Sequence, residues 1–101
     1  MISDETIERL CAALCVLSAP EEAQALLADL CTKRELVELA RRLEVAALLR
    51  EGKSYVEVSH ATGASSTTVS RVSKCLNGEA GGYRLVLNRM DERQPSSGPL
   101  G

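Results

Sequence analysis

Residues 65–74 hold the side chains with the clearest capacity for specific recognition. Four of the five residues from Ser65 to Val69 are Ser or Thr, and two cations, Arg71 and Lys74, follow them. These hydroxyl residues are mediocre helix formers, so their crowding favours a role beyond solubility. Short hydrogen-bonding side chains followed by cations suit base edges and phosphates of DNA, respectively. The predicted DNA contacts are Lys53, Ser65, Ser66, Thr67, Thr68, Ser70, Arg71 and Lys74.

Within this set the pattern predicts two roles. The residues predicted to read bases are Ser66, Thr67, Ser70 and Arg71. The residues predicted to position the DNA backbone are Ser65, Thr68, Lys53 and Lys74. Thr68 could instead face partly inward. The alternative without a binding function is a helical hairpin of an all-α protein, in which the Ser and Thr hydroxyl groups only contact solvent.

A helix-turn-helix over residues 54–77 would position these side chains. Ser54 and Glu57 have the spacing of a capping box, which predicts a helix start. Gly63 permits the positive φ of a sharp turn, and Ser65 is placed to cap a second helix. We expect the core to be built from Val56 and Val58 of the first helix, Ala64 of the turn, and Val69, Val72 and Leu76 of the second helix.

Helical periodicity and caps predict an all-α chain with four further helices, at about residues 4–17, 20–31, 33–51 and 82–92. Two more capping pairs are expected, Ser18 with Glu21 and Thr32 with Glu35. The third helix is apolar on more than one face, which is typical of a central helix. We predict one domain over residues 1–92 and a disordered tail, rich in Pro, Gly and Ser, over residues 93–101.

The composition of the 101 residues predicts a modest core and an oligomer. Phe and Trp are absent and Tyr occurs twice, so burial must come from aliphatic residues and Cys. The net charge of −2 argues against a generally basic nucleic-acid binder. The charge is unevenly distributed, however: residues 1–49 carry five Lys/Arg against nine Asp/Glu, and residues 50–93 carry seven against five. The predicted DNA-binding half is therefore mildly cationic.

The cysteines predict no metal centre and no disulfide. Cys11 and Cys15 lie one helical turn apart and could ligate a metal with His60 or Cys31, but such a pair is more often apolar packing. We see no signal peptide and no long apolar run, so the chain is expected in the cytoplasm, away from the membrane and with reduced thiols. A single histidine, no nucleophile–base pair and no phosphate-cradling Gly-rich loop argue against an enzyme.

The chain resembles the YerC/YecD branch of the Trp repressor superfamily, through the segments CTKRELVELARRLEVAALLREGKSY and TGASSTTVSRVSKCLN, followed by GGYRLVLNRM. The resemblance covers about residues 3–92. It implies a six-helix subunit intertwined with a second copy in a homodimer. The two helix-turn-helix motifs would then enter successive major grooves of double-stranded DNA, about 34 Å apart.

The resemblance also implies a possible effector pocket. Arg42 and Arg71 match the two arginines that flank the indole of L-tryptophan in the Trp repressor, and Thr32 matches a ligand-holding threonine. Val72 and Cys75 depart from the glycine and serine of the repressor and would fill space that the ligand needs. We therefore expect no cofactor. The two arginines could instead pair with carboxylates or with a DNA phosphate.

The sequence therefore predicts a homodimeric, sequence-specific transcription regulator, and more specifically a repressor. The rival hypothesis is an interaction or scaffold protein that keeps the fold without specific DNA binding. The acidic first half favours this rival. So does the lack of basic residues at Val56 and Ser59, where the resemblance places phosphate contacts in the repressor.

Overall fold

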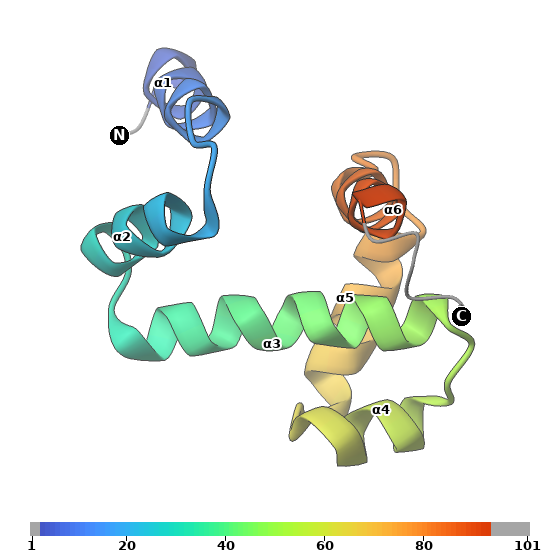
Figure 1. Ribbon diagram of the computed structural model, residues 1–101. Helices are drawn as coiled ribbons and strands as arrows, with labels where there is room; N and C mark the ends of the chain where they lie inside the picture. The colour runs from blue at the N-terminus through green and yellow to red at the C-terminus, as the bar shows by residue number, and fades with distance from the viewer. Residues whose placement is uncertain (1–2, 94–101) are drawn as a thin grey trace. The chain divides into compact units, whose positions relative to one another are not determined.

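The computed structural model describes residues 3–93 as six α-helices, without a strand in that range (Figure 1). The predicted all-α class is confirmed. The helices are α1 (Asp4–Cys15), α2 (Pro20–Leu30), α3 (Lys33–Arg50), α4 (Tyr55–Thr62), α5 (Ser66–Leu76) and α6 (Gly82–Arg93). Apart from Arg93, where α6 ends, the predicted disordered tail lies outside the described residues. Among the described residues, no helix combines the length and apolar content that a membrane crossing requires.

Backbone contacts divide the chain into two compact units, Met1–Val37 and Glu38–Gly101. The first holds α1, α2 and the beginning of α3. Local capping explains its helices: Ser3 accepts the Thr6 amide at the start of α1, and Thr32 forms a reciprocal capping box with Glu35 at the start of α3. Neither α1 nor α2 contains a buried residue.

The predicted Ser18–Glu21 capping pair is wrong. The helix α2 has Ala19 as its N-cap and Pro20 as its first residue, so Glu22, rather than Glu21, takes the third helical position. The Glu22 carboxylate accepts the Ser18 amide at 2.8 Å and also the Ser18 hydroxyl at 3.3 Å. These bonds, the amide bond first, lower the pKa of Glu22 below its ordinary value of 4.5.

The core lies in the second unit, between the end of α3 and the helices α4 to α6. The helix α5 packs against both α4 and α6. The buried cluster takes residues from every element of the unit: Val45, Ala46, Val58, Ala64, Val69, Val72 and Leu87. The burial of Val58, Ala64, Val69, Val72 and Leu76 confirms those parts of the expected helix-turn-helix core.

Val56 was also expected in this core, and that expectation is wrong. Its side chain is 77% exposed, whereas Val58 on the same helix is fully buried. Residues that are two positions apart in an α-helix point in directions that differ by roughly 200°, so Val56 and Val58 cannot face the same side. Val58 is the buried residue of α4.

Candidate nucleic-acid interface

The start of α4 is fixed by a capping box. The Glu57 carboxylate accepts the Ser54 amide at 2.8 Å, and the Ser54 hydroxyl accepts the Glu57 amide at 3.1 Å. These bonds lower the pKa of Glu57 below its ordinary value of 4.5, and the nearby Lys53 cation lowers it further. Ionised Glu57 therefore stabilises the start of α4.

The turn between α4 and α5 is fixed on several sides. Gly63 adopts a left-handed conformation with φ of 75°, and its amide bonds to the Ser59 carbonyl. The Ser59 hydroxyl donates to the Ala64 carbonyl at 2.6 Å. The Arg41 guanidinium of α3 donates to the Thr62 carbonyl at 3.2 Å. The Ser59 and Thr62 carbonyls at the end of α4 thus have partners, and the Ser59 hydroxyl connects α4 to the residue before the α5 cap.

Capping also explains two of the predicted contact residues at the start of α5. The Ser65 hydroxyl accepts the Thr68 amide at 3.1 Å, and the Ser65 and Thr68 hydroxyls bond to each other at 3.1 Å. Thr68 is half-buried, in line with its expected partly inward position. Both residues position the helix start, and Ser65 alone of the two is exposed.

The remaining α5 residues of the predicted set lie together on an exposed face. They line a hollow of about 580 Å³ with one residue from α4: Tyr55, Ser66, Thr67, Ser70, Arg71 and Lys74. Among the described residues, the α5 side chains of this group make no hydrogen bond or ion pair. The helix sequence STTVSRVSKCL also contains no acidic residue. The result is an accessible cationic surface whose donors and acceptors are available to a ligand.

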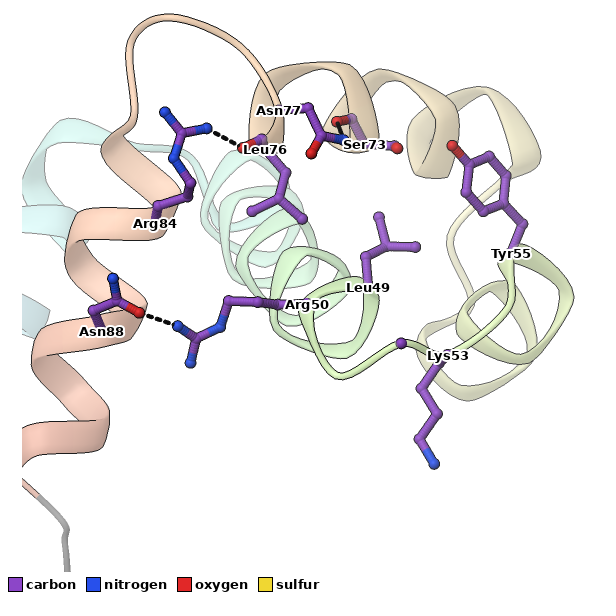
Figure 2. A pocket seen from close by; sticks show the side chains of 10 residues that line it. Leu49, Arg50, Lys53, Tyr55, Ser73, Leu76, Asn77, Arg84 and Asn88 are labelled. Atoms are coloured by element: carbon purple, nitrogen blue, oxygen red, sulfur yellow. Dashed lines mark hydrogen bonds between the residues drawn. The ribbon is translucent and has the colours of Figure 1, made fainter.

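Lys53 lies apart from this α5 face. It lines a second hollow, of about 490 Å³, between the end of α3 and the facing parts of α5 and α6 (Figure 2). In Figure 2 its side chain extends away from Leu49 and Leu76. Tyr55 lines both hollows and is the residue that the two linings have in common.

Tyr55 lies beside the α5 face although it is not among the predicted contact residues. It is the first residue of α4 and half-exposed, and its ring lies beside the α5 face. Its place directly after the Ser54 cap marks it as the first residue of a helix and does not say where its ring lies. Nothing in its sequence spacing indicated contact with α5.

Two arginines attach α6 to the rest of the second unit. Arg84 donates to the carbonyl of Leu76, the last residue of α5 (Figure 2). It also donates to the carbonyl of Gly78, just beyond that end. Arg50 of α3 donates to Asn88 and Asp91 of α6. Because α5 contacts α6 directly, these bonds also restrict the orientation of the exposed α5 face.

The possible effector pocket is small. Arg42 and Arg71 line a hollow of about 110 Å³ with Thr67, Thr68, Val72, Cys75 and Tyr83. A cavity of about 150 Å³ accepts benzene, so this hollow of the second unit is too small to enclose an indole by itself. Burial raises the pKa of Tyr83, as does the Cys75 charge, against a smaller opposing effect of Arg42.

The third predicted effector residue, Thr32, belongs to the first unit, where its hydroxyl accepts the Glu35 amide at 3.1 Å. The suggested carboxylate partners of Arg42 and Arg71 are also not found, because neither guanidinium forms an ion pair in residues 3–93. Both guanidinium groups are thus available to an anion.

The cysteines are free thiols. Cys11, Cys15 and Cys75 are exposed and Cys31 is half-buried, so the expectation that Cys11 and Cys15 pack in a core is wrong for this subunit. In the described part of the chain, no group of three or more His, Cys, Asp or Glu is arranged to hold a metal ion.

Comparison with known proteins agrees with this geometry. Residues 5–91 match the family described as Trp repressor protein. The uncharacterised protein YerC of Bacillus subtilis (strain 168) is 46% identical over 77 residues, which are 76% of this chain and 74% of YerC.

Two solved structures share the fold. A TrpR-like protein from Eubacterium eligens ATCC 27750 is 38% identical with a TM-score of 0.80, over 87% of this chain and 91% of that one. A candidate Trp repressor from Staphylococcus aureus is 33% identical with a TM-score of 0.81, over 88% and 89%. The resemblance seen in the sequence is thereby confirmed, and the chain belongs to the Trp repressor family.

Proposed function

We propose that this protein is a sequence-specific, DNA-binding transcription regulator that acts as a homodimer and represses by occupying a promoter. The observation that carries the proposal is the exposed α5 face, where Ser66, Thr67, Ser70, Arg71 and Lys74 have no intramolecular partner among the described residues. Membership of the Trp repressor family supports it, as does the similarity to a Staphylococcus aureus protein described as a candidate Trp repressor.

Different residues of the α5 face are suited to the bases and to the phosphates of DNA. In a helix-turn-helix, the N-terminal residues of the second helix meet base edges in the major groove, whereas residues further along approach the backbone. Ser66, Thr67, Ser70 and Arg71 are assigned to the bases, and Arg71 is suited to a guanine. Lys74 and Lys53 are assigned to phosphates, and Ser65 and Thr68 hold the helix start that presents these groups.

The homodimer is proposed from exposed apolar surface. Ile7, Leu10 and Leu14 of α1 are spaced along one helical stripe, and each is about half-exposed. Leu30 of α2 and Met90 of α6 are exposed to a similar degree. Burial of such side chains stabilises a protein by about 25 cal/mol per Å² of apolar surface, so a second copy that covers them would supply burial that one subunit lacks.

Selection of bound fragments from total genomic DNA tests the proposal. The purified protein should retain a small set of fragments with a shared palindromic sequence, and retention should weaken as salt is raised, because phosphate contacts release counterions. Lys74→Ala should weaken all duplexes about equally and lower the salt dependence by roughly one phosphate per copy.

One observation favours the rival scaffold function: α4, with the sequence YVEVSHAT, carries no Lys or Arg to contact phosphate. A dimer that retains no fragment at low salt would support the scaffold and contradict the regulator. Sedimentation of the same sample would establish whether the dimer itself is present.

A further inference from the structure

Val56 is an exposed apolar side chain at the edge of the α5 face. It is 77% exposed on the first turn of α4, where a β-branched residue gains little from helix propensity and nothing from burial. It borders a hollow of about 480 Å³ with Tyr55, Ser59, His60 and Ser66. Val56 therefore lies beside Ser66, the first residue of the proposed recognition helix α5.

This hollow and the 580 Å³ hollow along α5 form one continuous surface, because Tyr55 and Ser66 line both. We call this surface the α4–α5 face; its residues are Tyr55, Val56, Ser59, His60, Ser66, Thr67, Ser70, Arg71 and Lys74. The face has two permanent cations and no acidic residue. It is thus complementary in charge to DNA, and the occupant proposed here is the major groove.

The Ser and Thr hydroxyls of the α4–α5 face can bond to more than one kind of base and so discriminate little between them. The other residue types of the face limit which bases it could select by more specific contacts. Bidentate recognition of adenine needs Asn or Gln, and recognition of the cytosine amino group needs Asp or Glu. The face contains none of these four residue types. Guanine is matched by Arg71, and the thymine 5-methyl group is matched by apolar contact, which Val56 and the methyl of Thr67 offer.

The resemblance places a phosphate contact at this position in the repressor, but the valine side chain has no donor for a phosphate. We propose that Val56 instead contacts the 5-methyl group of a thymine, so that each preferred half-site carries a thymine as well as the guanine assigned to Arg71. The proposal rests on the proposed function, since it names the base chemistry that the same surface selects. Val56 would thereby be a specificity-determining residue: its exposure in the free protein is the feature that allows the contact.

Replacement of thymine by deoxyuracil tests this contact, because deoxyuracil lacks only the 5-methyl group. The preferred duplex is first selected with the wild-type protein, and each thymine is then replaced singly. Affinities are measured by fluorescence anisotropy for the wild type and for Val56→Ala. At one thymine per half-site, deoxyuracil should weaken the wild type about three- to fivefold, as expected for the loss of one methyl contact.

The double-mutant cycle assigns the effect to Val56. With Val56→Ala, the same deoxyuracil substitution should change the affinity by less than about 1.5-fold, because the contact is already lost. Val16→Ala is the matched control. Val16 is 78% exposed at the C-cap of α1, outside the apolar stripe of that helix, and its substitution should leave the full deoxyuracil effect in place.

The inference is overturned if the selected half-sites lack thymine, if no deoxyuracil substitution weakens binding, or if the effect persists undiminished in Val56→Ala. In those three cases the protein still binds DNA and the proposed function stands. If no duplex is retained in the first place, the proposed function fails and this inference fails with it.

Discussion

The Ser59 hydroxyl donates a 2.6 Å hydrogen bond to the Ala64 carbonyl, across the turn that joins α4 to α5. Ser59 is in the last two turns of α4, and Ala64 directly precedes the Ser65 cap of α5. The bond therefore links the two helices of the helix-turn-helix through one side chain. Ala64 is buried, so its carbonyl has little access to water as an alternative partner.

Ser59→Ala should lower the free energy of unfolding by about 1–2 kcal/mol, because the Ala64 carbonyl would lose its partner. Urea unfolding at fixed protein concentration measures the change. The control is Ser73→Ala on α5, where no hydrogen bond from the hydroxyl is found in residues 3–93 and the substitution should be close to neutral. Equal effects of the two substitutions would show that the bond does not stabilise the turn.

Gly63→Ala should destabilise the protein by about 1–2 kcal/mol through backbone conformation alone. Gly63 has a φ of +75°, and an added Cβ would meet no atom within 4 Å. The matched control is Gly82→Ala at the first position of α6, where an added Cβ also meets nothing within 4 Å and φ is not positive. That substitution should be neutral or slightly stabilising. Similar thermal shifts in both variants would contradict the conformational explanation.

The capping box predicts a dependence of stability on pH. Hydrogen bonds from Ser54 hold the pKa of Glu57 below its ordinary value of 4.5. A lowered pKa in the folded state means that ionised Glu57 stabilises the protein above about pH 4.5, and that this stabilisation is lost as the pH falls through the folded-state value.

The stability difference between the wild type and Glu57→Gln should therefore be largest near neutral pH and shrink under acid conditions. Urea titrations over a pH series measure it. The control Glu79→Gln removes an exposed carboxylate for which no hydrogen bond is found among the described residues. A difference that grows as the pH falls would have the wrong sign for the capping explanation.

L-Tryptophan should leave the affinity for the preferred duplex unchanged within about twofold. The hollow between Arg42 and Arg71 measures about 110 Å³, which is less than a benzene-sized cavity. Titration calorimetry should accordingly show no saturable heat. A tenfold tightening of DNA binding by tryptophan would show that Val72 and Cys75 do not close the pocket.

The caps at the starts of α3, α4 and α5 were predictable because their causes are local, whereas the cap predicted for α2 was wrong. Ser54 with Glu57, Thr32 with Glu35, and Ser65 with Thr68 act within three residues, so the sequence contains both partners. The left-handed turn at Gly63 is likewise a property of one residue. The observed helix bounds therefore agree closely with the expected ones. The exception is α1, which ends at Cys15 rather than at residue 17, because the amides of Val16 and Leu17 bond to carbonyls three residues back instead of four.

Long-range geometry was not predictable in the same way. Arg41 reaches Thr62, Arg50 reaches Asp91, and Arg84 reaches the end of α5, and no local pattern marks these partners. The exposure of Val56 could have been predicted, because roughly 200° separates it from Val58. The role of Tyr55 beside α5 required the relative placement of two helices, which residue spacing along one helix does not contain.

The most direct test of the central claim is the affinity of Arg71→Ala for the preferred duplex and for a scrambled duplex of equal length. Arg71 is exposed on the α4–α5 face, and a bidentate guanine contact is worth about 1–3 kcal/mol. Arg89→Ala on α6 removes an exposed cation outside this face as the control. We predict that Arg71→Ala binds the preferred duplex about 5- to 150-fold more weakly and loses discrimination against the scrambled one, while Arg89→Ala retains both. Unchanged affinity and discrimination in Arg71→Ala would contradict the account.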